Sequence, residues 1–164
     1  MPNRCVPFER TPNMIELIPT INEIIKYGLQ PNLEETDKEK LLEKSLVKIY
    51  NLYFDIKFEF DDTDFPDLEI TEYSDIRKNV ESNFKDFGLY KLIIDINDID
   101  NLTDNCIGDA IDDLTDIIRD LLETKLRIET NSLADGLWYF QFAFYTHTQQ
   151  HILDLLNFIK QKNG

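Results

Sequence analysis

The feature that most constrains the fold is a run near residues 107–122 that separates apolar and acidic residues onto two sides of a helix. On a helical wheel, four aspartates of this run fall within about 60° of Asp109, and the apolar residues lie opposite. We name these five residues the acidic ridge: Asp109, Asp112, Asp113, Asp116 and Asp120. This pattern predicts a helix over residues 108–126, with one face in a core and the other in water.

Related signals predict helices elsewhere in the chain. Apolar residues at three- and four-residue spacing predict helices over 14–28 and 71–87, each ending at or just before a glycine. Thr36-Asp37-Lys38-Glu39 matches a capping box, which predicts the start of another helix. Ser132 and Asp135 give a second capping signal, before a helical run that continues to about residue 160.

Two segments lack a helical pattern. Residues 55–75 are rich in acidic side chains and contain Pro66, so we predict an irregular acidic connection, with a short strand or an extended loop over 56–60. The signal in residues 89–104 is ambiguous, and their Asp and Asn residues resemble a loop. The sequence therefore predicts an all-α fold: an antiparallel bundle of about five helices, formed as one domain over residues 1–164.

Composition excludes several classes of function. The chain has 32 acidic and 17 basic residues and a net charge of −15, which argues against nucleic-acid binding because phosphate contacts need clustered Lys and Arg. The sequence has no apolar run long enough to span a membrane and no glycine-rich phosphate-binding loop. The only two cysteines, Cys5 and Cys106, are far apart and neither has a second Cys or His at metal-ligand spacing, so their number excludes a cysteine-rich zinc site. The start of the chain lacks the apolar region of a signal peptide, so we predict a cytoplasmic protein with reduced thiols.

The acidic ridge has two interpretations. Asp112-Asp113-x-x-Asp116 matches the aspartate-rich motif by which prenyl-diphosphate enzymes hold magnesium, and it could bind a divalent cation. The chain has no clear second acidic motif or basic cluster of the kind such enzymes need. The favoured interpretation is a solvated face, or a docking surface for a basic protein formed by all five residues of the ridge.

The only two histidines, His147 and His151, lie four residues apart and therefore share a helical face that Asp154 continues. Two imidazoles in this arrangement can bind zinc or iron, with Asp154 as a third ligand and an aspartate of the ridge as a fourth. The residues predicted for this metal site are His147, His151, Asp154, Asp112, Asp113 and Asp116. The alternative is two partly buried histidines hydrogen-bonded to acidic neighbours. The rest of this helix is apolar nearly all round, which predicts a central position in the bundle.

The C-terminal half resembles a bacterial family, common in Bacteroidetes-type bacteria, that is catalogued only as a domain of unknown function. The resemblance lies in residues 108–121, in Gly136-Leu137-Trp138, in residues 144–147 and in His151 and Asp154-x-Leu156. That family combines an Asp-Asp-Leu-x-Asp-Ile-x-x-Asp-Leu helix with a C-terminal helix carrying two histidines. The resemblance implies an all-helical fold without an assigned activity. It also implies corresponding residues at His147, His151, Asp112, Asp113, Asp116, Asp120 and Arg119.

Three hypotheses for function follow, and all remain open at this point: the two described next, and a purely structural subunit of a homo-oligomer. The first is a protein-binding or regulatory module, such as an immunity-like protein with a basic partner, that has no cofactor and no enzymatic activity. The second is a metal-binding protein or metal-dependent hydrolase that uses the His and Asp residues with Zn, Fe, Mn or Mg. The distance between the histidines and the ridge discriminates between the first two, because imidazoles within about 5 Å of two or more ridge carboxylates favour the metal site.

Overall fold

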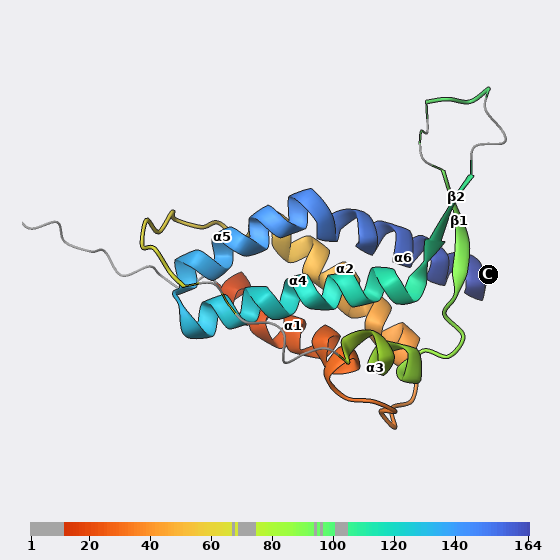
Figure 1. Ribbon diagram of the computed structural model, residues 1–164, viewed down its shortest axis with the longest axis horizontal. Coiled ribbons are helices and arrows are strands. Elements are labelled where there is room, and N and C mark those ends of the chain that lie inside the picture. Colours follow the sequence, from red (N-terminus) through yellow and green to blue (C-terminus); the bar gives the residue numbers. More distant parts are fainter. Residues whose placement is uncertain (1–11, 67, 69–74, 94, 96, 101–104) are drawn as a thin grey trace, which may run out of the picture.

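The computed structural model describes residues 12–66, 68, 75–93, 95, 97–100 and 105–164, and it forms a helical bundle with one small sheet (Figure 1). The helices are α1 (Pro12–Leu29), α2 (Lys38–Asp55), α3 (Ile76–Asn83), α4 (Ala110–Thr130), α5 (Leu133–Ala143) and α6 (Gln149–Asn163). A five-residue π-helix, η2 (Phe144–Thr148), joins α5 to α6 in one continuous rod. The predicted all-α bundle of about five helical segments is therefore confirmed.

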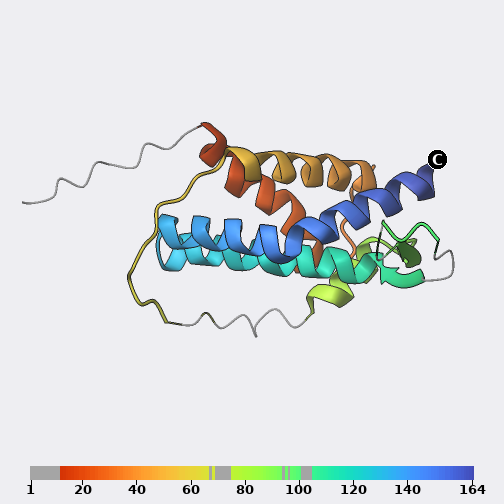
Figure 2. The same ribbon diagram turned by 90° about the horizontal axis from the view of Figure 1, so that it is seen from above.

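The core lies between four long rods: α1, α2, α4 and the α5–α6 rod (Figure 2). Each rod contributes apolar residues at helical spacing that are almost fully buried. Examples are Ile21 and Ile24 of α1, Leu42 and Leu46 of α2, Leu114 and Ile117 of α4, and Ile152 and Leu155 of α6. Burial of each such side chain is worth about 1.5–3 kcal/mol, so these stripes hold the rods together. The short helix α3 packs against α1 and α4.

The ambiguous segment contains a β-hairpin rather than only a loop. Strands β1 (Leu89–Ile93) and β2 (Asn105–Asp109) pair antiparallel, with Leu89 opposite Asp109 and Ile93 opposite Asn105. Because β2 takes residues 105–109, the predicted helix over 108–126 begins later, at Ala110. It begins there because the Asp109 side chain caps the helix by accepting a hydrogen bond from the amide of Ile111.

Other helix ends show where local signals succeed and fail. Ser132 caps α5 as predicted, with its hydroxyl accepting from the amide of Asp135 at 3.0 Å. The predicted capping box is wrong: Asp37 adopts a left-handed conformation, and no side chain caps α2. The helix predicted over 71–87 is shorter, residues 76–83, and residues 71–74 lie outside the described part of the chain. Residues 56–66 form neither helix nor strand, as the predicted irregular connection requires.

The α5–α6 rod is not surrounded on all sides, so its predicted central position is wrong. One side packs on α4 and α2, but the outer side carries exposed aromatic residues, including Phe142 and Tyr145. No helix in the described ranges combines the length and the apolar character needed to cross a membrane.

Candidate metal centre

The acidic ridge of α4 faces η2 and α6, and this packing corrects the prediction of a solvated face. Asp113 is buried, at 6% exposure, and Asp116 and Asp120 are half-buried. Of the five ridge residues only Asp112 is exposed. Buried carboxylates need hydrogen-bond donors, and the facing rod supplies them. The ridge is therefore largely an internal surface between two helices.

Asp109 and Asp112, the first two residues of the ridge, connect α4 to α3. The Arg77 guanidinium of α3 bridges Asp109 at 2.7 Å and Asp112 at 2.6 Å. Burial disfavours the charged form of Asp109, but its hydrogen bonds with Arg77 and with the Ile111 amide lower its pKa overall. These contacts fix α3 against the beginning of α4. Asp112, a predicted metal ligand, is thus not brought to the histidines.

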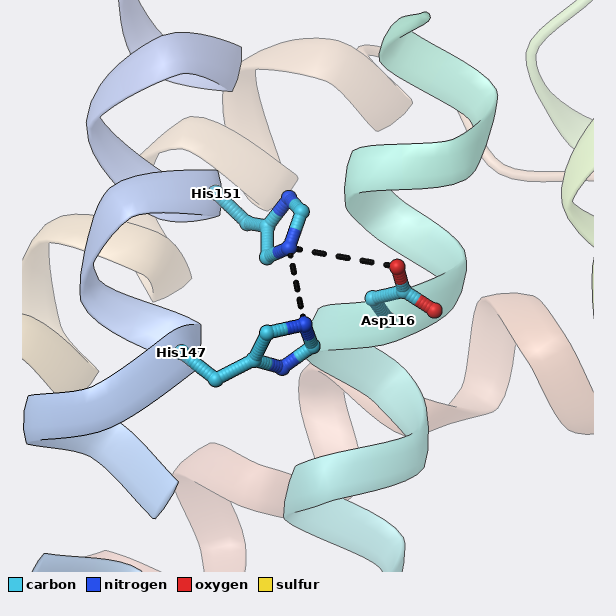
Figure 3. A group of neighbouring side chains, drawn as sticks. All are labelled: Asp116, His147 and His151. Carbon is cyan, nitrogen blue, oxygen red and sulfur yellow. Dashed lines mark hydrogen bonds and ion pairs between the residues drawn. The ribbon is translucent and has the colours of Figure 1, made fainter. Parts of the chain in front are cut away.

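Three predicted residues do come together, between α4 and the α5–α6 rod (Figure 3). The Nε2 atoms of His147 and His151 lie 3.1 Å apart, and Oδ2 of Asp116 lies 3.9 Å from Nε2 of His151. One ligand atom from each residue falls within 4.8 Å of the others. Figure 3 shows both rings pointing from the rod toward α4, where Asp116 meets them. We name these three residues the His-Asp cluster.

Each imidazole is held from behind by a second carboxylate of the ridge. Nδ1 of His147 lies 2.9 Å from Asp120, and Nδ1 of His151 lies 2.8 Å from Asp113. Both carboxylates also accept a hydroxyl hydrogen bond, Asp113 from Tyr90 of β1 and Asp120 from Thr148 at 2.6 Å. Burial, and then the hydrogen bond to Asp113, raise the pKa of Tyr90, so its hydroxyl keeps the proton that it donates.

This network determines which ring nitrogens carry hydrogen. An ionised carboxylate can only accept, so Nδ1 of each imidazole must donate, and Nε2 then presents its lone pair to the cluster. Two lone pairs facing each other at 3.1 Å repel unless a cation lies between them. That cation is either a proton or a metal ion. The hydrogen bond to Asp113 raises the pKa of the His151 imidazole despite its burial, and the charges of Asp113, Asp116 and Asp120 add to this effect.

Comparisons with protein families, with curated proteins and with solved structures found no match. The function must therefore be argued from the site, and membership of the bacterial family stays a prediction.

The π-helix η2 positions His147 against α4. His147 and Thr148 are the last two residues of η2, and both reach the same carboxylate, Asp120. A π-helix is wider than an α-helix, and such segments are rare and frequent at functional sites. Here η2 brings an imidazole and a neighbouring hydroxyl to one acceptor, which orients the imidazole.

Three residues of the predicted metal set, Asp112, Asp113 and Asp154, lie outside the His-Asp cluster, and sequence reasoning missed two supporting residues. Asp154 is outside the His-Asp cluster, because its carboxylate accepts from the Gln150 amide on its own helix at 3.0 Å. Tyr90 and Thr148 were not predicted as partners of the site. A signal for Tyr90 exists in Gly108, its partner across the hairpin. A Cβ at Gly108 would lie 2.5 Å from the Tyr90 ring, so glycine is what allows the ring to lie there.

Proposed function

We propose that this protein binds one divalent transition-metal ion through Nε2 of His147, Nε2 of His151 and Oδ2 of Asp116. The observation that carries the proposal is the convergence of the two Nε2 atoms, 3.1 Å apart, with both Nδ1 atoms held by carboxylates. In a tetrahedral zinc site with Zn–N bonds of about 2.05 Å, two nitrogens lie about 3.3 Å apart. The imidazoles therefore need little movement to bind zinc, whereas Asp116, 3.9 Å from Nε2 of His151, has to move closer to them.

The carboxylates behind the imidazoles support a metal site further. Histidine ligands in metal sites commonly donate their other N–H to a carboxylate, which fixes the tautomer and makes the ligand nitrogen more basic. Asp113 and Asp120 take this position for His151 and His147. Both histidines thus have the partner expected of a ligand.

The donor set narrows the choice of metal. Imidazole nitrogen suits zinc, iron, copper and nickel, whereas magnesium prefers carboxylate and water oxygen. Two histidines and one carboxylate are the ligands of many iron(II) sites and are also compatible with zinc. Zinc and iron(II) are therefore the ions that this cluster favours, and the magnesium alternative has less support.

An open coordination position would give the metal a chemical use. Three protein ligands leave a fourth position for water, and the His147 side chain, 49% exposed, places the cluster at the surface. Zinc in such sites lowers the pKa of its bound water to about 7, which generates a hydroxide nucleophile. The cluster therefore supports hydrolysis as its reaction class.

Binding of a basic protein, the other candidate, has weaker support. The net charge of −15 still favours it. However, Asp113 and Asp120 bind the histidines, while Asp109 and Asp112 bind Arg77. These carboxylates are thus engaged within the chain and offer little free charge to a partner.

Metal titration of the purified chain tests the proposal. After treatment with a chelator, the protein should bind one equivalent of Zn²⁺ or Co²⁺, with a rise in melting temperature. At a free metal concentration of about 100 times Kd, the gain in stability should be about 2.7 kcal/mol. His151→Gln should abolish this gain. Asp154→Asn, a matched change on the same helix outside the cluster, should retain it. Absence of stoichiometric binding, or equal binding by His151→Gln, would refute the proposal.

A further inference from the structure

The β-hairpin extends from one end of the bundle, and much of its surface is exposed. Figure 1 shows its two strands passing α6 and continuing beyond the helices. Leu89, Ile93 and Ile107 of these strands are between 68% and 73% exposed. Tyr90 of β1 differs from them, because it is half-buried and its ring lies against Phe158 of α6, with the ring centroids 5.4 Å apart. Tyr90 is therefore a side chain by which the hairpin is docked on the bundle.

The Tyr90 hydroxyl connects this contact to the metal centre. It donates to Oδ2 of Asp113, whose other oxygen, Oδ1, lies 2.8 Å from Nδ1 of His151. Nε2 of the same imidazole is one of the ligand atoms of the proposed metal site. A continuous series of hydrogen bonds therefore runs from the hairpin, through one carboxylate, to a metal ligand. Asp113 is only 6% exposed, so little water competes for its oxygens.

A metal ion changes the constraints on this series. Without it, the two Nε2 lone pairs face each other at 3.1 Å, and the imidazoles relieve their repulsion by rotating apart or by binding a proton. Rotation of the His151 ring withdraws its Nδ1 donor from Asp113 and leaves that carboxylate free to turn. A bound metal fixes the ring, and its positive charge makes the Nδ1–H group a stronger donor. Asp113 then stays in the position where the Tyr90 hydroxyl meets it.

One effect acts in the opposite direction. The metal withdraws charge from Asp113 through the imidazole, which makes the carboxylate a weaker acceptor for the Tyr90 hydroxyl. The carboxylate remains ionised, so this hydrogen bond is weakened and not lost. Rotation of Asp113 away from Tyr90 would break the bond altogether. Orientation therefore outweighs the withdrawal of charge, and the metal favours the docked hairpin.

We propose that metal binding at the His-Asp cluster and docking of the β-hairpin on the bundle reinforce each other through Asp113 and Tyr90. This inference rests on the proposed metal site and gives that site a regulated element, the hairpin. Linkage requires reciprocity: the factor by which the metal favours the docked hairpin is the factor by which the docked hairpin raises metal affinity. Such couplings are typically about 5- to 150-fold. Tyr90 is thus a positioning residue, which acts on the metal through Asp113 and His151.

Hydrogen exchange of the unaltered chain, with and without Zn²⁺, tests the coupling. The amides of β1 and β2 exchange when the hairpin undocks, so zinc should slow their exchange by at least about fivefold. The slowing should level off once the site is full, because the undocked state also binds zinc, only more weakly. This plateau distinguishes undocking of the hairpin from unfolding of the whole chain, which zinc would suppress further with every increase in its free concentration.

Two variants test the role of the Tyr90 hydroxyl. Tyr90→Phe removes the hydroxyl and keeps the ring. It should weaken Zn²⁺ binding by at least about fivefold in competition with a chromophoric chelator, and zinc should no longer slow exchange in the hairpin. Gly108→Ala keeps the hydroxyl but places a Cβ 2.5 Å from the Tyr90 ring, which has to move away. It should produce the same two losses.

Tyr139→Phe is the matched control. The Tyr139 hydroxyl also donates to a carboxylate of α4, that of Glu123, at 2.8 Å. Glu123 pairs with Arg127 and lies outside the series that leads to the metal. Loss of this hydroxyl should therefore leave both the zinc affinity and the effect of zinc on the hairpin unchanged.

Failure of the coupling and failure of the metal site give different results. A chain that binds no zinc refutes both. A chain that binds zinc while exchange in the hairpin is unchanged or faster retains the metal site and refutes the coupling, because withdrawal of charge then equals or exceeds the effect of orientation. Equal losses of affinity in Tyr90→Phe and Tyr139→Phe would also overturn the coupling. So would slowing without a plateau, because the hairpin would then exchange only when the whole chain unfolds.

Discussion

Replacement of Asp113 by asparagine separates the charge behind the metal centre from its geometry. The amide of asparagine can still accept the hydrogen bond from Nδ1 of His151, and its NH₂ group can donate to the Tyr90 hydroxyl. The imidazole thus keeps its orientation while the negative charge is lost. The expected result is weaker metal binding in a protein that still folds, since the ligands themselves are unchanged.

The size of the effect follows from the position of the charge. Asp113 lies 2.8 Å from Nδ1 of His151, and the metal would bind at the opposite ring nitrogen. With a Zn–N bond of about 2.05 Å, the charge and the metal are about 7 Å apart. A charge of −1 and a charge of +2 at that distance interact by about 1.2 kcal/mol at a dielectric constant of about 80, and by about 2.4 kcal/mol at about 40. The affinity should therefore fall about 8- to 60-fold, within the range found for such supporting residues.

Competition with a chromophoric chelator measures this change, and Asp112→Asn provides the control. Asp112 is the neighbouring residue, and its replacement removes the same charge from the same helix. It is exposed and bound to Arg77, away from the cluster. Asp112→Asn should change the affinity less than about threefold, because an exposed charge is screened by solvent and salt. Equal losses in the two variants would show that net charge, and not the Asp113–His151 pair, determines affinity, which would refute the reasoning.

Two other predictions concern the stability of the bundle. Gly136→Ala should cost about 1–3 kcal/mol in urea denaturation, because the added Cβ would lie 2.7 Å from the backbone nitrogen of Ile128. Gly88→Ala meets no atom within 4 Å and should change stability by less than about 0.5 kcal/mol. Arg77 contributes to a lowered pKa of Asp109. The resulting stabilisation is full above the unfolded value of about 3.9 and is lost as pH falls through the lower folded value. Wild-type stability should therefore decline relative to Asp109→Asn between about pH 5 and pH 2, whereas parallel curves would contradict this assignment.

The helical spacing of apolar residues predicted the bundle, because a helix with an apolar stripe is stable only when that stripe is buried. Every rod of the core carries apolar residues three and four positions apart, and such a stripe has to be covered whatever its neighbour is. The hairpin was not predicted because its strands are short and mostly exposed: Leu89 and Ile93 face solvent, so no buried alternation marks β1. The capping box predicted at Thr36 failed for a different reason. A capping motif is compatible with more than one backbone conformation, and here Asp37 adopts a left-handed one.

The histidines and one carboxylate of the cluster were predictable because a spacing of four residues guarantees a shared face. Asp154 meets the same rule and was wrongly included. Residues on one helical face do not all contact the next helix. The Asp154 side chain instead accepts a hydrogen bond from Gln150 on its own helix. Tyr90 could not be placed, since its contact with Asp113 depends on a hairpin that the sequence did not reveal. Local spacing therefore identifies ligands on one helix, whereas supporting residues depend on tertiary contacts.

The acidic ridge shows why a charged helical face cannot be assigned to solvent from its pattern alone. A carboxylate leaves water at low cost when donors replace its hydration. For Asp113 those donors are the imidazole of His151 and the hydroxyl of Tyr90, which lie 38 and 23 residues away in the chain. The same five aspartates could have remained a solvated face if the facing rod had lacked histidines. Two histidines opposite an acidic face are thus a reason to expect that the face is buried against them, and this pairing is the pattern by which other sequences with such a site could be recognised.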